Sequence, residues 1–284
     1  MVGKGVGPAR EVKSKELFPG IFSRHAAAYE RRLDQIMSRG EARGRERVLE
    51  LVDARQGMRV LDLACGPGNL TRRIAALVAP DGQVVGVDLA PGMIERAQAA
   101  GIANATFEVM DIEELRFPDD SFDAALCGHG LQFAPHLDLA LGEARRVLHE
   151  DSRFAASVPV TPMSQSFCSL FDGVIDRLLP PAPEAVDQQP TRAVVADAGA
   201  LTHAALAAGF ASARVEVVEE TVRWESAEQL VALCTSWWDC AARLEGIDLE
   251  RRKAFVDEAT AALKHEHPGP IETTGRNHVL FALA

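Results

Sequence analysis

The fold is decided at residues 60–71, which read V-L-D-L-A-C-G-P-G-N-L-T. An apolar run of strand length leads into Gly66 and Gly68, and apolar residues at helical spacing follow at once. This pattern predicts a strand, a tight turn and a helix. Because glycine has no side chain, backbone at such a turn can approach a ligand closely, and open α/β sheets bind ligands at this carboxyl edge. The stretch therefore predicts a ligand-binding loop.

Apolar runs of strand length recur along the chain and alternate with stretches of helical spacing. We expect strands at 60–64, 84–88, 106–110, 122–127, 154–158, 213–218 and 278–283. We expect helices at 22–40, 41–53, 70–78, 93–100, 136–148, 226–246 and 248–264. Strands that are buried on both faces and joined by helices indicate a parallel α/β sheet.

Acidic residues lie in or at the end of the first three strands. A dinucleotide fingerprint would have a third glycine where this chain has Thr71, and Asp62 would repel a pyrophosphate but attract an ammonium group. Asp88 ends the second strand, where a carboxylate typically accepts hydrogen bonds from ribose hydroxyls. Asp111 and Ile112 follow the third strand. The Asp111 side chain could accept a hydrogen bond from an adenine amine, and Ile112 could pack on the adenine ring. An amine site, a ribose site and a base site together match S-adenosylmethionine.

Four motifs in order carry a family resemblance. They are D-L-A-C-G-P-G-N at 62–69, V-D-L-A-P-G-M-I at 87–94, M-D-I-E-E-L-R-F-P-D-D-S-F-D at 110–123 and E-A-R-R-V-L at 143–148. The chain resembles class I S-adenosylmethionine-dependent methyltransferases, closest to the ubiquinone/menaquinone-biosynthesis-like small-molecule branch. This resemblance implies a Rossmann-like α/β fold of seven strands with an antiparallel last strand. The chain departs from the pattern at 150–152, where relatives often carry a pair of glycines.

The resemblance also implies a set of cofactor contacts. The backbone from Ala64 to Gly68 would face the methionine part, Asp88 would hold the ribose, and Leu89, Met93 and Ile112 would flank the adenine. The full predicted set is Tyr29, Asp62, Ala64, Cys65, Gly66, Gly68, Asp88, Leu89, Met93, Asp111, Ile112, Cys127 and Gly128.

The loop at 127–133 reads C-G-H-G-L-Q-F and is expected where the sulfonium lies. The predicted catalytic residues are His129, as the proton acceptor for an acceptor hydroxyl, with Gln132 and Tyr29 as orienting groups. As an alternative, His129 only hydrogen-bonds backbone or cofactor and never moves a proton. Similarly, Tyr29 could be a core aromatic and Cys127 a packed thiol.

Apolar residues expected around this loop indicate that the methyl acceptor is apolar or aromatic. The predicted substrate pocket is Phe22, Phe133, Met163, Phe167 and Trp237, with Phe171, Trp224 and Leu233 as further apolar candidates. A quinol, a polyketide or another aromatic natural product would fit such a chamber. Methyl transfer to oxygen or carbon would be a direct in-line displacement that releases S-adenosyl-L-homocysteine.

The same patterns divide the chain into segments. We expect a flexible N-terminal segment at 1–19, the cofactor-binding core with its N-terminal helices at 20–158, an excursion over the active site at 159–196, more core at 197–223, a helical lid at 224–270 and the last core strand at 271–284.

Composition limits the classes of partner. The chain has 284 residues, 30 basic and 41 acidic, for a net charge of −11, which argues against a nucleic-acid partner. No run predicts a membrane span or a secretory signal, so we expect a cytoplasmic and, from its preference for Arg over Lys, bacterial enzyme; a homodimer is left open. His265 and His267 have no further ligands nearby, so we expect no metal site. The charged run at 43–47 is expected on a solvated helix face.

Two other functions stay open. A non-catalytic S-adenosylmethionine-binding regulator or scaffold would share the fold, since a fold does not determine catalysis. A nicotinamide-dependent oxidoreductase would explain the glycine loop and Asp88, but not Thr71 or the later motifs.

Overall fold

The computed structural model describes residues 11–161, 165–235 and 238–284, and its centre is a seven-stranded sheet. The strands are β2 (Arg59–Leu63), β3 (Gln83–Asp88), β4 (Ala105–Val109), β5 (Phe122–Gly128), β6 (Leu148–Thr161), β8 (Ser212–Trp224) and β9 (Ile271–Leu283). Their order is β4-β3-β2-β5-β6-β9-β8, and β9 runs antiparallel to both of its neighbours while the other pairs are parallel. The predicted α/β class and the antiparallel last strand are confirmed.

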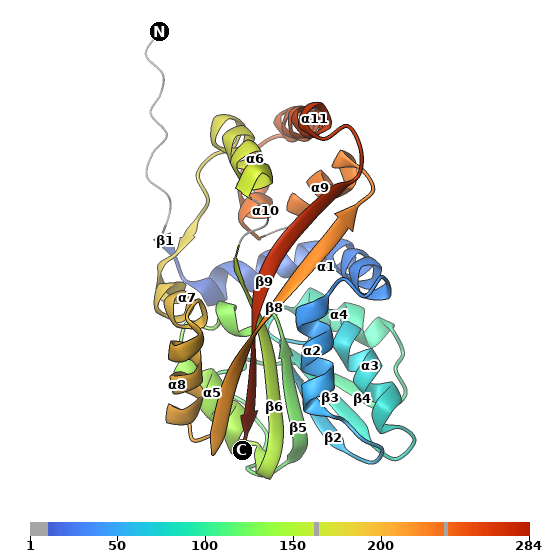
Figure 1. The fold of residues 1–284 in the computed structure, drawn as a ribbon, viewed down its shortest axis with the longest axis vertical. Helices are drawn as coiled ribbons and strands as arrows, with labels where there is room; N and C mark the ends of the chain where they lie inside the picture. The colour runs from blue at the N-terminus through green and yellow to red at the C-terminus, as the bar shows by residue number, and fades with distance from the viewer. Residues whose placement is uncertain (1–10, 162–164, 236–237) are drawn as a thin grey trace.

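Helices cover both faces of the sheet (Figure 1). One face carries α2 (Arg43–Val52), α3 (Asn69–Val78) and α4 (Pro91–Ala99), and the other carries α5 (Leu137–Arg146) and α8 (Ala198–Ala207), with α7 (Gln189–Val195) above α8. Ile74 and Leu126 belong to the core of the first face, and Phe122 and Phe154 to the core of the second; all four are fully buried. Because both faces are covered, the strands read as apolar runs, which is why the sequence predicts them well.

Beyond the carboxyl edge of the sheet, a second layer of helices packs around the extended ends of β8 and β9 (Figure 1). It consists of α6 (Gln165–Leu178), α9 (Ala227–Cys234), α10 (Trp238–Glu245) and α11 (Leu249–Glu266). These helices share an apolar core that includes Phe171, Leu230 and Phe255. We call this group the lid layer. The stripe expected to form one helix at 226–246 is divided between α9 and α10, and the expected excursion supplies α6.

The last two strands are longer than their apolar patterns predict. β8 and β9 pair in continuous register from Ser212 opposite Leu283 to Trp224 opposite Ile271. Polar residues alternate with apolar ones along β8 and in the outer half of β9, so only the inner half of β9 reads as a buried strand. The ribbon carries the lid layer away from the sheet edge and leaves space beneath it.

Helix α1 (Ser14–Ser38) lies between the sheet and the lid layer (Figure 1). It begins at Ser14, so part of the expected N-terminal segment at 1–19 is helical. Pro19 hides this start in the sequence, since proline normally interrupts a helix. Burial of Phe18 and Ile21, which are 4% and 1% exposed, compensates for it. A short strand before the helix, β1 (Glu11–Val12), pairs with β7 (Glu184–Ala185).

Polar contacts fix α1 to both layers. Arg24 forms a two-point ion pair with Glu245 of α10, at 2.6 Å for each nitrogen–oxygen contact. On the other side, Ser23 Oγ accepts a hydrogen bond from the Gly92 N–H at the start of α4. The helix is therefore a fixed wall between the two layers. Over the described residues, no helix is both long and apolar enough to cross a bilayer.

The packing of α2 against β9 depends on a glycine. A Cβ at Gly44 would lie 2.8 Å from Asn277 Cγ, whereas a Cβ at Gly142 of α5 would meet nothing within 4 Å. We expect Gly44→Ala to lower the free energy of unfolding by about 1–3 kcal/mol, since the helix must move off the strand. In the matched Gly142→Ala variant the free energy of unfolding should rise by up to about 1 kcal/mol, because alanine has a higher helix propensity than glycine. Urea unfolding measures both, and equal effects would contradict the close approach.

Candidate active site

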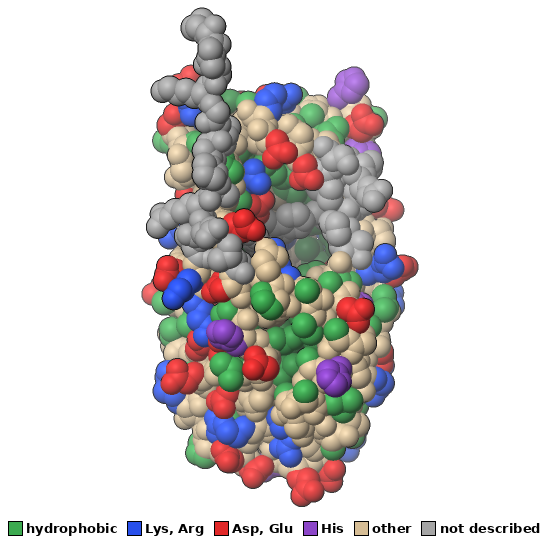
Figure 2. All heavy atoms as spheres, turned by 90° about the vertical axis from the view of Figure 1, so that its left-hand side faces the viewer, with side chains coloured by type: hydrophobic (Ala, Val, Ile, Leu, Met, Phe, Trp, Pro, Cys, Tyr) green, Lys and Arg blue, Asp and Glu red, His purple; other side chains and the backbone are tan. Residues whose placement is uncertain are grey.

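A cavity of about 700 Å³ lies at the carboxyl ends of β2, β3 and β5, between the sheet, α1 and the lid layer. Figure 2 shows the molecular surface hollowed between the lid layer and the sheet-containing part. Thirteen predicted site residues line the cavity: Phe22, Tyr29, Ala64, Gly66, Asp88, Leu89, Met93, Asp111, Ile112, Gly128, His129, Gln132 and Phe133. Residues from five separate parts of the chain are thus brought together.

Four residues of the predicted cofactor set are packed behind the cavity wall. They are Asp62, Cys65, Gly68 and Cys127. A Cβ at Gly68 would lie 3.3 Å from Phe107, so this glycine allows close packing as well as the turn at the start of α3, where its φ is +82°. Burial raises the pKa of the Cys127 thiol to about 12, which keeps it protonated and unreactive.

Asp62 is buried within β2 and is 1% exposed. The Thr71 hydroxyl donates a 2.6 Å hydrogen bond to its Oδ2, while its Oδ1 has no partner among the described residues. Burial raises the pKa of Asp62 to about 7. Thr71, which marks the departure from a dinucleotide fingerprint, is therefore the residue that holds this carboxyl group.

Asp88 ends β3 and joins the glycine loop to the next helix. Its Oδ2 accepts a 2.9 Å hydrogen bond from the Gly66 N–H, and its Oδ1 accepts one of 2.9 Å from the Ala90 N–H. Enclosure raises the pKa of Asp88, and these two N–H donors lower it in part. Each carboxylate oxygen keeps a further lone pair on the cavity side for a ligand hydroxyl.

Asp111 forms an ion pair with a residue that is absent from the predicted set. Lys15 of α1 forms ion pairs of 2.5 Å with Asp111 Oδ2 and 2.6 Å with Glu113 Oε2. The other oxygen, Oδ1, accepts from the Glu113 N–H. Lys15 also lines the cavity, so the expected base site contains a cation as well as a carboxylate.

Two cavity residues that are not glycine have left-handed backbone. Ala64 follows β2 with a φ of +53°, and His129 follows β5 with a φ of +65°. Their loops touch, because a Cβ at Gly130 would lie 2.4 Å from Ala64 Cβ. Such backbone costs energy and concentrates at functional sites. The strain therefore points to this corner of the cavity as a site of function.

His129 presents a neutral imidazole. Burial lowers its pKa well below the ordinary value of 6.5, and the charge of nearby Arg45 lowers it further. Its Nε2 is buried without a hydrogen-bond partner in the described part of the chain. Gln132 donates its 2.9 Å hydrogen bond to the backbone oxygen of His129, so it holds the loop and does not touch the imidazole.

Arg45 corrects the expectation that residues 43–47 form a solvated face. It is only 9% exposed, lines the cavity and donates a 3.1 Å hydrogen bond to the Tyr29 hydroxyl. No carboxylate among the described residues lies within ion-pair distance of it. Arg32 lies over the ring of the same tyrosine, with its Cζ 5.4 Å from the ring centroid. In the sequence, nothing distinguishes Arg45 from its four charged or small neighbours.

Aromatic side chains form the wall beside α1. Phe133 contacts Phe18 and Phe22 edge to face, at centroid distances of 5.0 and 5.2 Å, and Phe22 contacts Tyr29 at 6.3 Å. Trp224 and Leu233 also line the cavity, whereas Phe171 packs inside the lid layer. Met163, Trp237 and the side chain of Phe167 lie outside the described residues.

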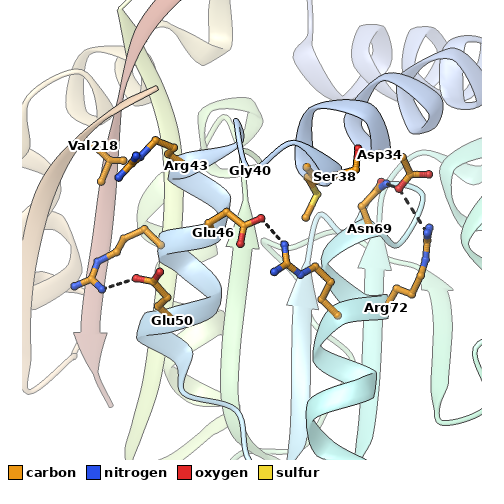
Figure 3. A pocket seen from close by; sticks show the side chains of 12 residues that line it. Asp34, Ser38, Gly40, Arg43, Glu46, Glu50, Asn69, Arg72 and Val218 are labelled. Atoms are coloured by element: carbon orange, nitrogen blue, oxygen red, sulfur yellow. Dashed lines mark hydrogen bonds and ion pairs between the residues drawn. The ribbon is translucent and has the colours of Figure 1, made fainter. Parts of the chain in front are cut away.

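A second groove, of about 760 Å³, lies on the outer surface between the end of α1, α2 and α3 (Figure 3). Arg72 pairs with Asp34 at 3.5 Å, Arg47 pairs with Glu50 at 2.8 Å, and Arg73 pairs with Glu46. Asn69 Nδ2 donates a 2.7 Å hydrogen bond to Asp34. The contacts to Asp34 and Glu46 tie α3, the helix after the glycine loop, to α1 and α2.

Comparisons with known proteins agree with this geometry. The family model described as "Methyltransferase domain" matches residues 54–200. Nocamycin O-methyltransferase of Saccharothrix syringae is 32% identical over 247 residues, which cover 80% of this chain and 86% of that protein. The ubiquinone/menaquinone biosynthesis C-methyltransferase UbiE of Stutzerimonas stutzeri is 34% identical over 166 residues, which cover 56% of this chain and 64% of that protein.

Solved structures share the fold at low identity. The match to the [4+2]-cyclase SpnF covers 97% of this chain and 98% of that chain, with a TM-score of 0.56 and 17% sequence identity. The YcgJ protein of Bacillus subtilis has a TM-score of 0.51 and 20% identity, and the match covers 85% of this chain and 97% of that one. The family match and the first relative show that this chain belongs to the methyltransferase domain family. The predicted family and enzyme class are confirmed.

The buried Asp62 makes stability depend on pH. Folding raises its pKa to about 7, so between about pH 4 and 7 the folded protein retains a proton that the unfolded chain releases, and stability falls as the pH rises. The Asp62→Asn variant has no carboxyl group to lose this proton. Between pH 4 and 7.5 its free energy of unfolding should therefore rise by up to about 4 kcal/mol relative to that of the wild type. Urea unfolding across this range measures it. Parallel pH profiles would contradict an uncompensated buried carboxyl.

Proposed function

We propose that this chain transfers a methyl group from S-adenosylmethionine to an oxygen or carbon atom of a small, apolar or aromatic metabolite and releases S-adenosylhomocysteine. One observation carries the proposal: the Asp88 carboxylate, the glycine loop and the strained His129 converge on one aromatic-lined cavity. The small-molecule O- and C-methyltransferases among the relatives support this class of acceptor. The cytoplasmic location and the homodimer stay predictions.

The cavity has groups that suit each part of the cofactor. Asp88 would accept hydrogen bonds from the ribose hydroxyls, and Leu89, Met93 and Ile112 would enclose the adenine. The unpartnered Oδ1 of Asp62 would attract the ammonium group, directly or through a water molecule, from behind the loop. Backbone from Ala64 to Gly68 would face the methionine chain.

Tyr29 and Arg45 would hold the methionine carboxylate. The guanidinium is buried, and its one hydrogen bond within the described chain goes to the Tyr29 hydroxyl. Charged groups removed from water need a partner of opposite charge, and a carboxylate would provide it. The structure thus adds Arg45 to the predicted set, and Tyr29 is proposed to act with Arg45 on the cofactor more than on His129.

The acceptor would lie against the aromatic wall, which excludes water from the reacting atoms. When bound, the cofactor supplies a methyl group made electrophilic by its sulfonium. We assign His129 Nε2 the role of accepting the hydrogen bond, and then the proton, of an acceptor hydroxyl. Its lowered pKa keeps the imidazole neutral throughout the physiological range. Gln132 would hold the backbone of His129 in its strained form.

Methyl transfer tests the proposal directly. The protein is incubated with methyl-labelled S-adenosylmethionine and metabolite extracts, and mass spectrometry detects products that gain one methyl group. We expect Asp88→Ala to weaken S-adenosylhomocysteine binding about 100-fold, because two hydrogen bonds to a charged group are lost. Asp81→Ala, which removes an exposed carboxylate, is the matched control. Cofactor binding with no labelled product in any extract would favour the regulator or scaffold instead.

Arg45 can be tested with two nucleosides that differ in the amino-acid group. Methylthioadenosine has the adenosine and the sulfur of S-adenosylhomocysteine but lacks its carboxylate. We expect Arg45→Met to weaken S-adenosylhomocysteine binding at least about tenfold and to leave methylthioadenosine binding unchanged. Calorimetry measures both. An equal loss for the two nucleosides would show that Arg45 supports the cavity wall and does not bind the carboxylate.

A further inference from the structure

Unpartnered polar atoms gather at one side of the cavity floor. Both side-chain atoms of Asn277, Oδ1 and Nδ2, are buried without a hydrogen-bond partner in the described chain, as are His129 Nε2 and Ser157 Oγ. Asn277 is 1% exposed and lines the cavity together with His129. A buried polar group without a partner destabilises the folded state, so such groups are rare in native proteins. Several in one place point to a missing ligand.

The three residues come from neighbouring strands on the α2 side of the sheet. Asn277 of β9 lies opposite Pro159 of β6, and Ser157 of β6 lies beside Gly128 at the end of β5. The His129 N–H donates a 3.0 Å hydrogen bond to the Ser157 backbone oxygen, which places the imidazole loop over β6. The Asn277 amide lies within reach of the imidazole and acts to raise the pKa of His129, against the larger effect of burial. The amide and the imidazole therefore form one polar pair.

The cofactor does not need this pair. Under the proposed function, its amine, carboxylate, ribose and adenine are all assigned to other residues. The sulfonium and the methyl group, expected beside the 127–133 loop, accept and donate no conventional hydrogen bonds. These polar atoms are therefore left for the acceptor.

We propose that Asn277 and His129 together recognise an acceptor with a hydroxyl next to a carbonyl, as in an enolised 1,3-diketone or an ortho-hydroxyaryl ketone. In such acceptors the hydroxyl already donates internally to the carbonyl, so its proton is shared between that oxygen and His129 Nε2, with the imidazole proton on Nδ1. The carbonyl accepts from Asn277 Nδ2 with its other lone pair. Asn277 is thus a specificity-determining residue. The inference rests on the proposed function and narrows its substrate class.

Two isomeric probes carry the same two polar groups at different relative positions, so they test whether the positions of these groups matter for binding. 2-Acetyl-1-naphthol carries the hydroxyl beside the acetyl group, and 6-acetyl-2-naphthol carries the same groups on different rings. Calorimetry measures their binding to wild-type protein saturated with S-adenosylhomocysteine. We expect the first isomer to bind at least about tenfold more tightly, because the second leaves one of the two buried groups unpartnered.

The matched variant is Asn277→Leu, which keeps the branched shape and removes both polar atoms. It should bind the two isomers equally, retain its affinity for S-adenosylhomocysteine and unfold at a higher temperature than the wild type, since two unpartnered atoms are gone. Glu272→Gln, an exposed change on the same strand, should behave as the wild type.

Three results would overturn the inference. The wild type could bind the two isomers equally or bind neither; Asn277→Leu could keep the preference; or Asn277→Leu could lose S-adenosylhomocysteine, which would assign the amide to the cofactor. In the first two cases, intact binding of S-adenosylhomocysteine by the wild type leaves the proposed function standing. Failure of the wild type to bind that nucleoside would refute both proposals.

Discussion

The contact on which the site depends joins the Asp88 carboxylate to the Gly66 amide, at 2.9 Å. It ties the end of β3 to the loop after β2, and so sets the distance between the Asp88 carboxylate and the backbone of the glycine loop. Gly66 needs a φ of +55° to present its N–H in this direction, which an L-residue adopts only at a cost. The helices and the lid layer enclose this corner but do not create it.

Most of the core could be predicted from the sequence, because strands buried on both faces have one apolar pattern. The antiparallel last strand followed only from the family resemblance. Asp88 was found for the same reason, since it ends such a strand. Arg45 and Asn277 were missed, because α2 and the outer part of β9 have polar residues on more than one face. Their burial and their place in the cavity wall, which depend on the tertiary fold, show that these side chains point inward.

The site combines groups that each reduce the stability of the isolated protein. Asp62 is buried with one unpartnered oxygen, Arg45 is buried with one hydrogen bond, and His129 has strained backbone and a buried, unpartnered nitrogen. A stable fold tolerates such features where a ligand later satisfies them. Their concentration at one sheet edge, on both sides of the glycine loop, is stronger support for a two-ligand site than any one of them.

Fold alone does not determine the reaction. A protein described as a [4+2]-cyclase shares this architecture over nearly its whole length, at 17% identity. What distinguishes methyl transfer from binding or cyclisation must therefore lie in the side chains around the reacting atoms. In this chain those are an aromatic wall from α1 and a polar pair from β9 and the loop after β5. The wall selects acceptors by size and polarity, whereas the pair selects them by the relative positions of two oxygen atoms, which is the more restrictive requirement because hydrogen bonds depend on direction.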